Sequence, residues 1–580
     1  MGIKHFFIWM KKNHPLCLKD IHVNNEDFET EEIEIDNLCI DMNGVIHYCA
    51  QKIYQYGNFS RNKNLLRKQH TRNGLKWQLK FFQEICERVE FLRKIVKPKK
   101  RLILCVDGVA GMAKMSQQRQ RRFKSAREPG GLEHTDFNPI NITPGTELMD
   151  YLMKYIDWYI RMMVTQSPEW ENICVIFSSD KVPGEGEHKI INYMRRYGED
   201  NESWCIHGLD ADLIMLGLAT MEPKFYILRE NIYRQDEFHV LNIGKMRNEL
   251  SLRLKWSKKE NTVSYNPKLA IYDFVFMCFL VGNDFLPTIP TLAILEGGID
   301  TMLDVYSQTC QVYGHLTRIQ RRRGFDPQVV IRPSSLQIFL GTLSGYEKGL
   351  LEEKQSQQGS FHEDKILNNH TTFNDDKCEI DFDSYKLDFY QKKFGEKKVE
   401  TVAQEYLQGM QWVLSYYTHG ISSYSWYFKE FYAPFLYDLT LACAEYKGDI
   451  LPFGKPYPPF VQLLCVIPPK YSDILPKPLS DFMTDEKYNL KKYYPETFEI
   501  DVSGKRQEWE GIVVLPMVDV DKVTEKYEEH YPKVEDKYKR RNRFDTSYVY
   551  KYKTRGQKYL FKSFYGNIPE CNVNKISFNL

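Results

Sequence analysis

The segment RLILCVDGVAGMAKMSQQRQRRFKSAREPGG, residues 101–131, joins a short apolar run to a long basic stretch. The run RLILCV is typical of a buried strand, and Asp107 follows it directly. Residues 112–127 contain no Gly, Pro, Asp or Glu and are followed by Pro129-Gly130-Gly131, so they predict a helix with a defined end. The segment therefore predicts a strand and a helix with an acidic residue at their junction.

The same pattern recurs between about residues 36 and 290. NLCI precedes Asp41, SWCIHGL precedes Asp210, and NICVIF at 172–177 forms a further apolar run, with helical stretches between them. Such alternation predicts an α/β fold with a mostly parallel central sheet flanked by helices. At 580 residues the chain is longer than a domain built around a single hydrophobic core, so we expect further segments added to this α/β unit.

Composition excludes several classes of protein. The formal net charge is only +2, so a nucleic-acid site would be a local patch. The 13 cysteines include no CxxC pair, which argues against a disulfide framework or a zinc site and for a reducing compartment. The apolar run at 274–282 is too short to span a bilayer, so we expect a soluble protein without a membrane partner.

Acidic residues gather where the predicted strands end. Ligands of open α/β sheets bind outside the carboxyl ends of the strands. A lone Asp-Gly or Asp-Asn is ordinarily a turn or a helix cap, but here seven acids occur in matching contexts. Carboxylates without His or Cys select Mg²⁺ or Mn²⁺, and two such ions can activate water and stabilise the leaving oxygen of a phosphodiester. The candidates are Asp41, Asp107, Glu185, Glu187, Asp210, Asp212 and Asp284.

The basic helix predicted at 112–127 carries a second candidate site. Lys114, Gln118, Arg121 and Arg122 recur at helical spacing and would lie on one face. A solvated basic helix is ordinarily the commoner interpretation, but such helices usually interleave acids, and this one has none. The face could hold a 5′-monophosphate and exclude a capped or triphosphate end, which indicates an exonuclease.

Several motifs together resemble the XRN family of 5′→3′ exoribonucleases. LCIDMNGVIH, DGVAGMAKMSQQRQRRF, VPGEGEHKI, GLDADLIMLGL and FLVGNDFLP occur in the family's order, followed by QWVLSYYTHG and FYAPF. The resemblance runs to about residue 520 and implies a 5′-nuclease (PIN-like) core. It also implies processive hydrolysis of single-stranded, 5′-monophosphorylated RNA to mononucleotides by two-metal-ion catalysis, in RNA decay. The seven acids would then bind two Mg²⁺ ions, for which Mn²⁺ may substitute, and the basic face would be the 5′-phosphate pocket.

The resemblance also implies residues that stack on substrate bases. His47 matches a family histidine that packs against the first nucleotides. Its aromatic partner comes from the second family region, where Tyr424 and Trp426 are both candidates. The family usually has two Trp there, and it has a Pro-Arg-like pair where this chain has Gly111-Met112.

The resemblance divides the chain into four parts. We expect a nuclease core at 1–345, a polar and flexible linker at 346–395, a second region completing the pocket at 396–520, and a charged C-terminal tail segment at 521–580. The chain would be a compact member without long C-terminal domains. We expect a monomer that acts downstream of a decapping enzyme, in the cytoplasm rather than the nucleus.

Two other functions remain as alternatives. A flap-type, structure-specific endonuclease shares clustered strand-end acids but gives no reason for the basic face. A non-catalytic RNA-binding scaffold would not need the complete set of acids.

Overall fold

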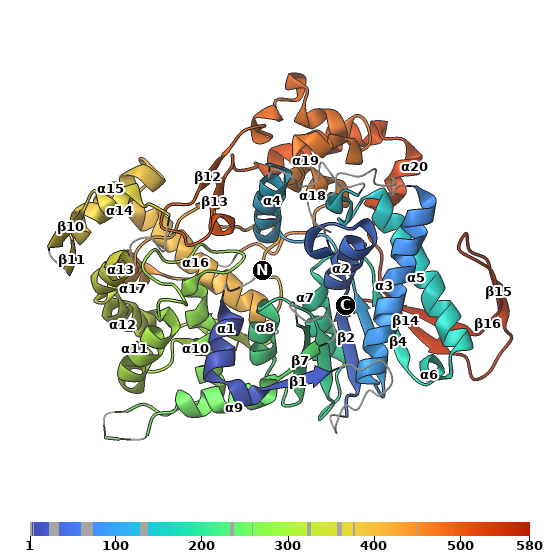
Figure 1. Ribbon diagram of the computed structural model, residues 1–580, viewed down its shortest axis with the longest axis horizontal. Coiled ribbons are helices and arrows are strands. Elements are labelled where there is room, and N and C mark those ends of the chain that lie inside the picture. The colour runs from blue at the N-terminus through green and yellow to red at the C-terminus, as the bar shows by residue number, and fades with distance from the viewer. Residues whose placement is uncertain are drawn as a thin grey trace.

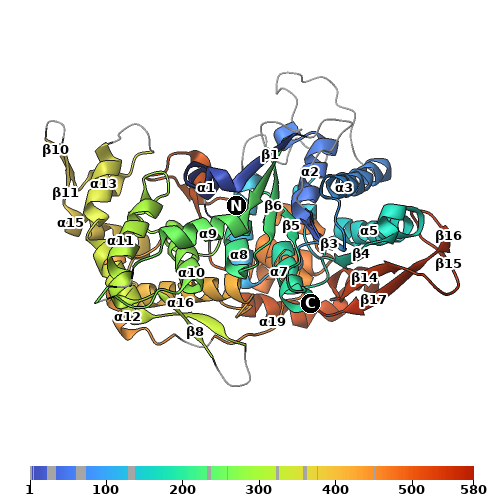
Figure 2. The same ribbon diagram turned by 90° about the horizontal axis from the view of Figure 1, so that it is seen from below.

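The protein is described by a computed structural model, whose fold is shown in Figures 1 and 2. The described residues are 3, 5–22, 34–59, 74–127, 137–231, 237–257, 259–260, 262–321, 326–356, 362–374, 377–448 and 451–580.

A nine-stranded sheet organises the fold. Its order is β1-β7-β6-β5-β2-β3-β4-β14-β17. The five strands from β6 to β4 are parallel, and antiparallel strands extend both edges. This confirms the predicted α/β class, in which helices cover a parallel centre. The strands are β1 Leu18–His22, β2 Asn37–Asp41, β3 Arg101–Cys105, β4 Cys174–Ser178, β5 Trp204–His207, β6 Phe225–Glu230, β7 Glu237–Asn242, β14 Ser547–Tyr552 and β17 Val573–Phe578.

Helices cover both faces of the sheet because side chains alternate along each central strand. Leu38 and Ile40 of β2 pack with α2 (Met42–Tyr54), α3 (Leu75–Val96) and α5 (Glu147–Gln166) on one face. Cys39 points to the other face, where α7 (Gly186–Tyr197) and α8 (Asp212–Thr220) pack. Both faces are apolar, as expected for strands buried on two sides. Smaller helices on this unit are α1 Phe6–Asn13, α6 Pro168–Glu171 and α9 Ile243–Arg253.

A helical region extends the apolar core on the face of the sheet that α7 and α8 cover. Its long helix α16 (Val399–Thr418) packs against α8 and α10 and carries Tyr416 and Tyr417 towards the sheet. One continuous apolar cluster joins these helices to the sheet, so the two family regions share a core. The remaining elements here are α10 Pro267–Met277, α11 Gly298–Tyr313, β8 Thr317–Gln320, β9 Gln328–Ile331, α12 Pro333–Ser344 and α17 Leu436–Glu445.

The stretch 346–395 differs from the flexible linker that we predicted. Its described residues form α13 Glu347–Ser356, α14 Lys365–Asn368, a hairpin of β10 Thr371–Asn374 and β11 Lys377–Ile380, and α15 Phe382–Phe394. Leu351, Leu367 and Tyr385 are buried. These buried residues belong to three separate short helices, which is why the sequence shows little periodicity. Residues 357–361 and 375–376 lie outside the described residues, and the division at 346 and 395 remains a prediction.

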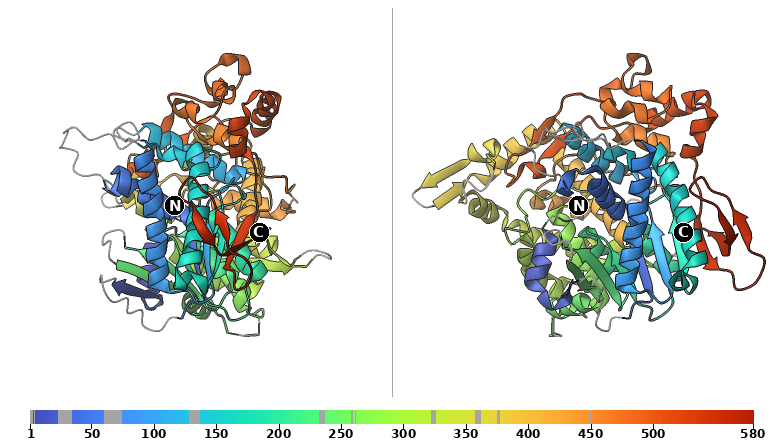
Figure 3. Two further views of the ribbon diagram at one scale, coloured as in Figure 1. Left: turned by 90° about the vertical axis from the view of Figure 1, so that its right-hand side faces the viewer. Right: turned by 45° about the vertical axis from the view of Figure 1, so that its right-hand side comes forward.

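The C-terminal part is not a peripheral charged tail in its described residues. β14 pairs antiparallel with β4 and so extends the main sheet. Tyr550 of β14 is fully buried, and the red strands lie beside the sheet in Figure 3. Lys575 of β17 forms an ion pair with Asp157 of α5 at 2.7 Å. Some of the charged residues that suggested a tail therefore attach this part of the chain to α5. The other elements are α18 Pro459–Val466, β12 Glu499–Asp501, β13 Ile512–Val514, α19 Val520–His530, α20 Asp536–Lys539, β15 Tyr559–Phe561 and β16 Ile568–Cys571.

Within the described part of the chain, every helix is too short or too polar to cross a membrane.

Candidate active site

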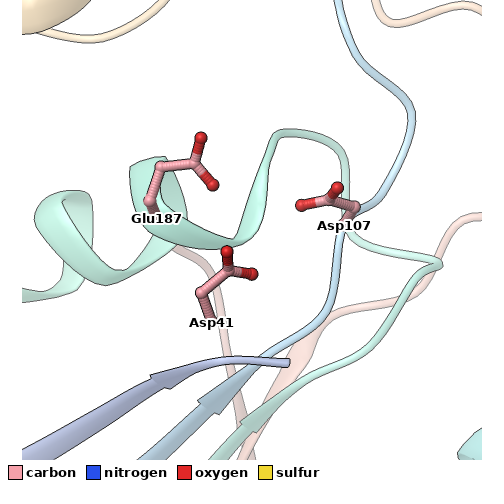
Figure 4. Close-up of side chains that lie close together, drawn as sticks. All are labelled: Asp41, Asp107 and Glu187. Carbon is pink, nitrogen blue, oxygen red and sulfur yellow. The ribbon is translucent and has the colours of Figure 1, made fainter. Parts of the chain in front are cut away.

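Three carboxylates meet at the carboxyl ends of the central strands. Asp41 ends β2 and caps α2, accepting a hydrogen bond from the Asn43 amide at 3.3 Å. Asp107 follows β3 and accepts one from the Gly186 amide at 2.7 Å. Glu187 lies in the first turn of α7. Oxygen atoms of Asp41, Asp107 and Glu187 lie within 4.8 Å of one another (Figure 4), so this acidic cluster could bind a metal ion.

Gly186 allows the three carboxylates to lie close together. A Cβ atom at this position would lie 2.6 Å from Asp41 Oδ1 and 3.0 Å from the Cys105 carbonyl oxygen. Neither neighbour can move freely, because Cys105 is in β3 and Asp41 caps α2. The glycine between the two acids of VPGEGEHK is therefore a steric requirement of the cluster.

A second group of acids surrounds Lys114 of α4 (Met112–Arg127). The Lys114 Nζ atom lies 2.5 Å from Glu185 Oε2 and 2.9 Å from Asp284 Oδ2. Asp212 begins α8, and its Oδ1 atom is buried without a hydrogen-bond partner among the described residues. Asp210 lies in the exposed turn just before α8. All seven predicted acids thus lie near the same end of the sheet, and Lys114 contacts two of them. Its part in the phosphate pocket remains a prediction.

The charges of this site do not balance. Burial, then Asp107 and Asp210, raise the pKa of Asp41 well above its ordinary range, and burial, Glu185 and Asp41 do the same for Glu187. Burial and Asp284 raise the pKa of Asp212 to about 7. Burial also opposes the charge of Asp284, yet Lys114 holds the pKa of that carboxyl down at about 2. Among the described residues no ion pair reaches Asp41, Asp107 or Glu187, since Lys114 contacts Glu185 and Asp284, and oxygen ligands of this kind suit hard divalent cations.

The other predicted phosphate-binding residues lie further along α4, which has the predicted bounds. Gln118 is buried with its Oε1 atom unpaired, and Arg122 has an unpaired buried Nη1 atom, in each case with respect to the described residues. Burial and Arg121 lower the pKa of Arg122, while burial, Arg121 and Arg122 lower the pKa of His47 to about 4. The positive charges of Arg121 and Arg122 therefore act on His47 of α2. These residues form a cationic pocket close to the carboxylates, since Asp107 acts on Arg122 and Arg121 acts on Asp284.

The aromatic candidates are arranged differently from the expected stacking pair. Trp426 stacks on Trp412 with ring centroids 5.2 Å apart, and Trp412 stacks on Tyr416 at 5.0 Å. Tyr424 is buried edge-on against Phe453 at 5.5 Å. No ring contact joins either candidate to His47 in the part of the chain described. The stacking role of Tyr424 or Trp426 therefore remains a prediction.

The structure adds three residues that sequence reasoning missed. Tyr416 donates a hydrogen bond to Glu185. The Asn43 Oδ1 atom accepts one from the Asp107 amide at 3.0 Å. The Lys189 ammonium donates to the carbonyl oxygens of Val106 at 2.7 Å and Ser179 at 2.8 Å, which joins the ends of β3 and β4. All three lie within motifs already singled out, but nothing in a motif distinguishes a positioning residue from a core residue.

Two family models cover most of the chain. The XRN 5′-3′ exonuclease N-terminus matches residues 1–231, and the Xrn1 helical domain matches residues 264–384 and 350–579. The chain belongs to the XRN family. This confirms the resemblance that the motifs suggested, and the XRN N-terminal region contains all of the candidate acids except Asp284.

Curated relatives of this XRN chain support the assignment. Human 5′-3′ exoribonuclease 1 is 31% identical over 91% of this chain and 34% of its own length. The Schizosaccharomyces pombe protein of that name is 28% identical over 95% of this chain and 50% of its own. The XRN chain thus spans a third to a half of these two relatives. Among solved structures, the catalytic core of Rad2 with DNA substrate has 14% identity and a TM-score of 0.30 over 67% of this chain and 85% of that chain, too distant to carry an argument.

Proposed function

We propose that this XRN chain is a 5′→3′ exoribonuclease that hydrolyses single-stranded RNA bearing a 5′-monophosphate and releases nucleoside monophosphates one after another. One observation carries the proposal: a group of buried carboxylates lies next to a half-buried cationic pocket, and α4 contributes Lys114 to the first and Arg122 to the second. The first group suits metal-assisted cleavage of a phosphodiester, and the second suits recognition of a terminal phosphate.

The carboxylates are proposed to hold two Mg²⁺ ions, for which Mn²⁺ may substitute. Asp41, Asp107 and Glu187 fit a divalent ion because their oxygens already converge, and the unpaired Oδ1 atom of Asp212 offers a further ligand. When bound, such ions lower the pKa of water and neutralise charge on the leaving oxygen. The full ligand set would be Asp41, Asp107, Glu185, Glu187, Asp210, Asp212 and Asp284.

The chain's own groups position the RNA end. Arg122 and Arg121 are proposed to donate charge-assisted hydrogen bonds to the 5′-phosphate, with Gln118 donating from its side-chain amide. A pKa of about 4 keeps His47 neutral at pH 7, so it presents an uncharged ring face to a base beside the phosphate. Lys114 holds Glu185 and Asp284 together, and Tyr416 fixes Glu185 from the second family region. A 5′ end anchored in this way would place its first phosphodiester at the carboxylates.

The chemistry of the substrate suggests the setting. A 5′-monophosphate end is what removal of an RNA cap leaves, so the proposed upstream partner is a decapping enzyme. We propose that the protein acts as a monomer in RNA decay, in the cytoplasm rather than the nucleus. No observation in the structure favours the flap-type endonuclease or the scaffold.

End-labelled RNA tests the proposal. One single-stranded RNA, labelled at its 3′ end, carries a 5′-monophosphate, a 5′-hydroxyl or a 5′-triphosphate and is incubated with Mg²⁺ or with EDTA. We expect rapid loss of the monophosphate RNA alone, without internal fragments, and none in EDTA. Equal cleavage of all three ends would contradict the phosphate pocket, and no cleavage in Mg²⁺ would favour the scaffold.

A further inference from the structure

A cavity of about 360 Å³ lies along a second side of α4. We call it the lateral chamber; α4 lines it with Ala113, Gln117, Arg121 and Lys124, and residues 281–288, 427–433 and 501–517 contribute other walls. Two of its lining residues, Arg121 and Asp284, also belong to the candidate active site. The chamber is therefore contiguous with that site, without being part of the carboxylate cluster.

Two acids of the chamber wall, Asp364 and Asp501, are engaged by other groups of the wall. Asp364 accepts hydrogen bonds from the amides of Ile366 and Leu367, both at 3.1 Å. Asp501 pairs with Lys393 at 2.5 Å and accepts a hydrogen bond from Tyr432 at 2.6 Å. Their charge is thus largely satisfied by groups of the protein itself.

One cation of the wall stands in contrast to these acids. Lys505 is half-buried, and its ammonium group has no hydrogen-bond or ion-pair partner among the described residues. Burial lowers the pKa of Lys505, although the carboxylates of Glu510, Asp501 and Asp364 act in the opposite direction. Burial together with Lys505 lowers the pKa of the neighbouring Lys354. Gly504 lies next to Lys354 and Asp364, because a Cβ atom there would lie 3.3 Å from both Lys354 Nζ and Asp364 Oδ2. Lys505 thus places in the wall an ammonium group without a partner in the described part of the chain, close enough to lower the pKa of Lys354, and such a group can bind an anion.

The chamber also offers apolar surface to a base. Phe431 and the exposed Trp509 line it together with the lysines. Aromatic faces beside cations recognise nucleotides of any base, because every base has a π-face. A volume of 360 Å³ is at the lower end of the range for small-molecule pockets and suits one nucleotide better than a strand.

We propose that the lateral chamber binds the nucleoside monophosphate released by cleavage, before it leaves the protein. This inference rests on the proposed function, which makes that nucleotide the product. The 5′-phosphate of the product already lies at Arg121, which lines both sites, so it can pass to Lys505 and Lys354 while the next RNA end enters the pocket. Product and incoming end would then occupy different sides of α4.

Calorimetry with adenosine 5′-monophosphate in EDTA tests the chamber without requiring activity. Because the nucleotide would also enter the 5′-phosphate pocket, the titration uses an Arg122→Met background. We expect one nucleotide per chain, bound about tenfold more weakly when Lys505→Met is added, since a hydrogen bond to a charged group is lost. Lys354→Met should have the same direction of effect, and Lys477→Ala, whose side chain is 80% exposed, should have none. Unchanged affinity in both chamber variants would overturn the proposal.

Kinetics separates this inference from the proposed function. In Lys505→Met alone, single-turnover hydrolysis of 5′-monophosphorylated RNA should match wild type, while inhibition by added adenosine 5′-monophosphate weakens about tenfold. A slower single turnover with a raised KM for RNA would instead show that the RNA strand runs through the chamber, and would overturn the product site. Failure of the wild type to hydrolyse RNA refutes the proposed function, whereas the calorimetric result still decides whether the chamber binds a nucleotide.

Discussion

Replacement of Arg122 by methionine should remove preference for a 5′-monophosphate while leaving the fold intact. Methionine keeps the apolar stem of the side chain and removes the half-buried guanidinium, whose Nη1 atom has no partner among the described residues. A hydrogen bond between charged groups contributes about 1.5–3 kcal/mol, so kcat/KM for monophosphorylated RNA should fall about 10- to 150-fold. Because burial and Arg121 already disfavour the charge of Arg122, the free energy of unfolding should not decrease.

The assay is competition between 5′-monophosphate and 5′-hydroxyl RNAs of one sequence, with denaturation curves for both proteins. Arg127→Met is the matched control, because Arg127 lies on the same helix but is exposed at its end. We expect the control to keep the wild-type ratio of the two rates. An unchanged ratio in Arg122→Met, with the fold intact, would refute the assignment of the phosphate pocket.

Three further changes test the carboxylate site. Burial and Asp284 raise the pKa of Asp212 to about 7 in the folded protein, whereas the pKa of an unfolded Asp is about 3.9. The free energy of unfolding of the metal-free protein should therefore decrease as pH rises from about 4 to 7. Denaturation curves should show a weaker pH dependence in Asp212→Asn. Gly186→Ala should abolish hydrolysis and lower the melting temperature, because its Cβ atom would lie 2.6 Å from Asp41 Oδ1, whereas the unobstructed Gly349→Ala should not. Tyr416→Phe should raise the Mg²⁺ concentration for half-maximal rate, by about 2- to 10-fold for one lost hydrogen bond, and an unchanged Mg²⁺ dependence would contradict its role at Glu185.

Local patterns predicted much of the fold, because strands buried on both faces and helices with clear ends leave strong signals. The apolar run at 101–106 forms β3, and the helix at 112–127 has its predicted bounds. The position of β14 was not predictable. Its segment SYVYKY pairs with β4, which lies hundreds of residues earlier in the sequence, and no local pattern indicates that pairing. The helices and strands in the described part of 346–395 were missed because their buried residues are spread over four short elements.

The candidate site was predicted in composition better than in geometry. Strand ends and a glycine between two acids brought Asp41, Asp107 and Glu187 to one place, as topology requires. Lys114 shares its helix face with Arg122, but its contacts with Glu185 and Asp284 could not be predicted, because they depend on how α4 packs against the strand ends. Tyr416 could not be singled out, since its role depends on how α16 packs against α7 and the sheet.

The most direct test of the account compares a linear RNA bearing a 5′-monophosphate with a circular RNA of the same sequence, each incubated with the protein and Mg²⁺. An exonuclease that requires a 5′-phosphate has nothing to bind in the circle. We predict that the linear RNA is converted to nucleoside monophosphates while the circle stays intact. Cutting of the circle at a comparable rate would contradict the account and indicate an endonuclease.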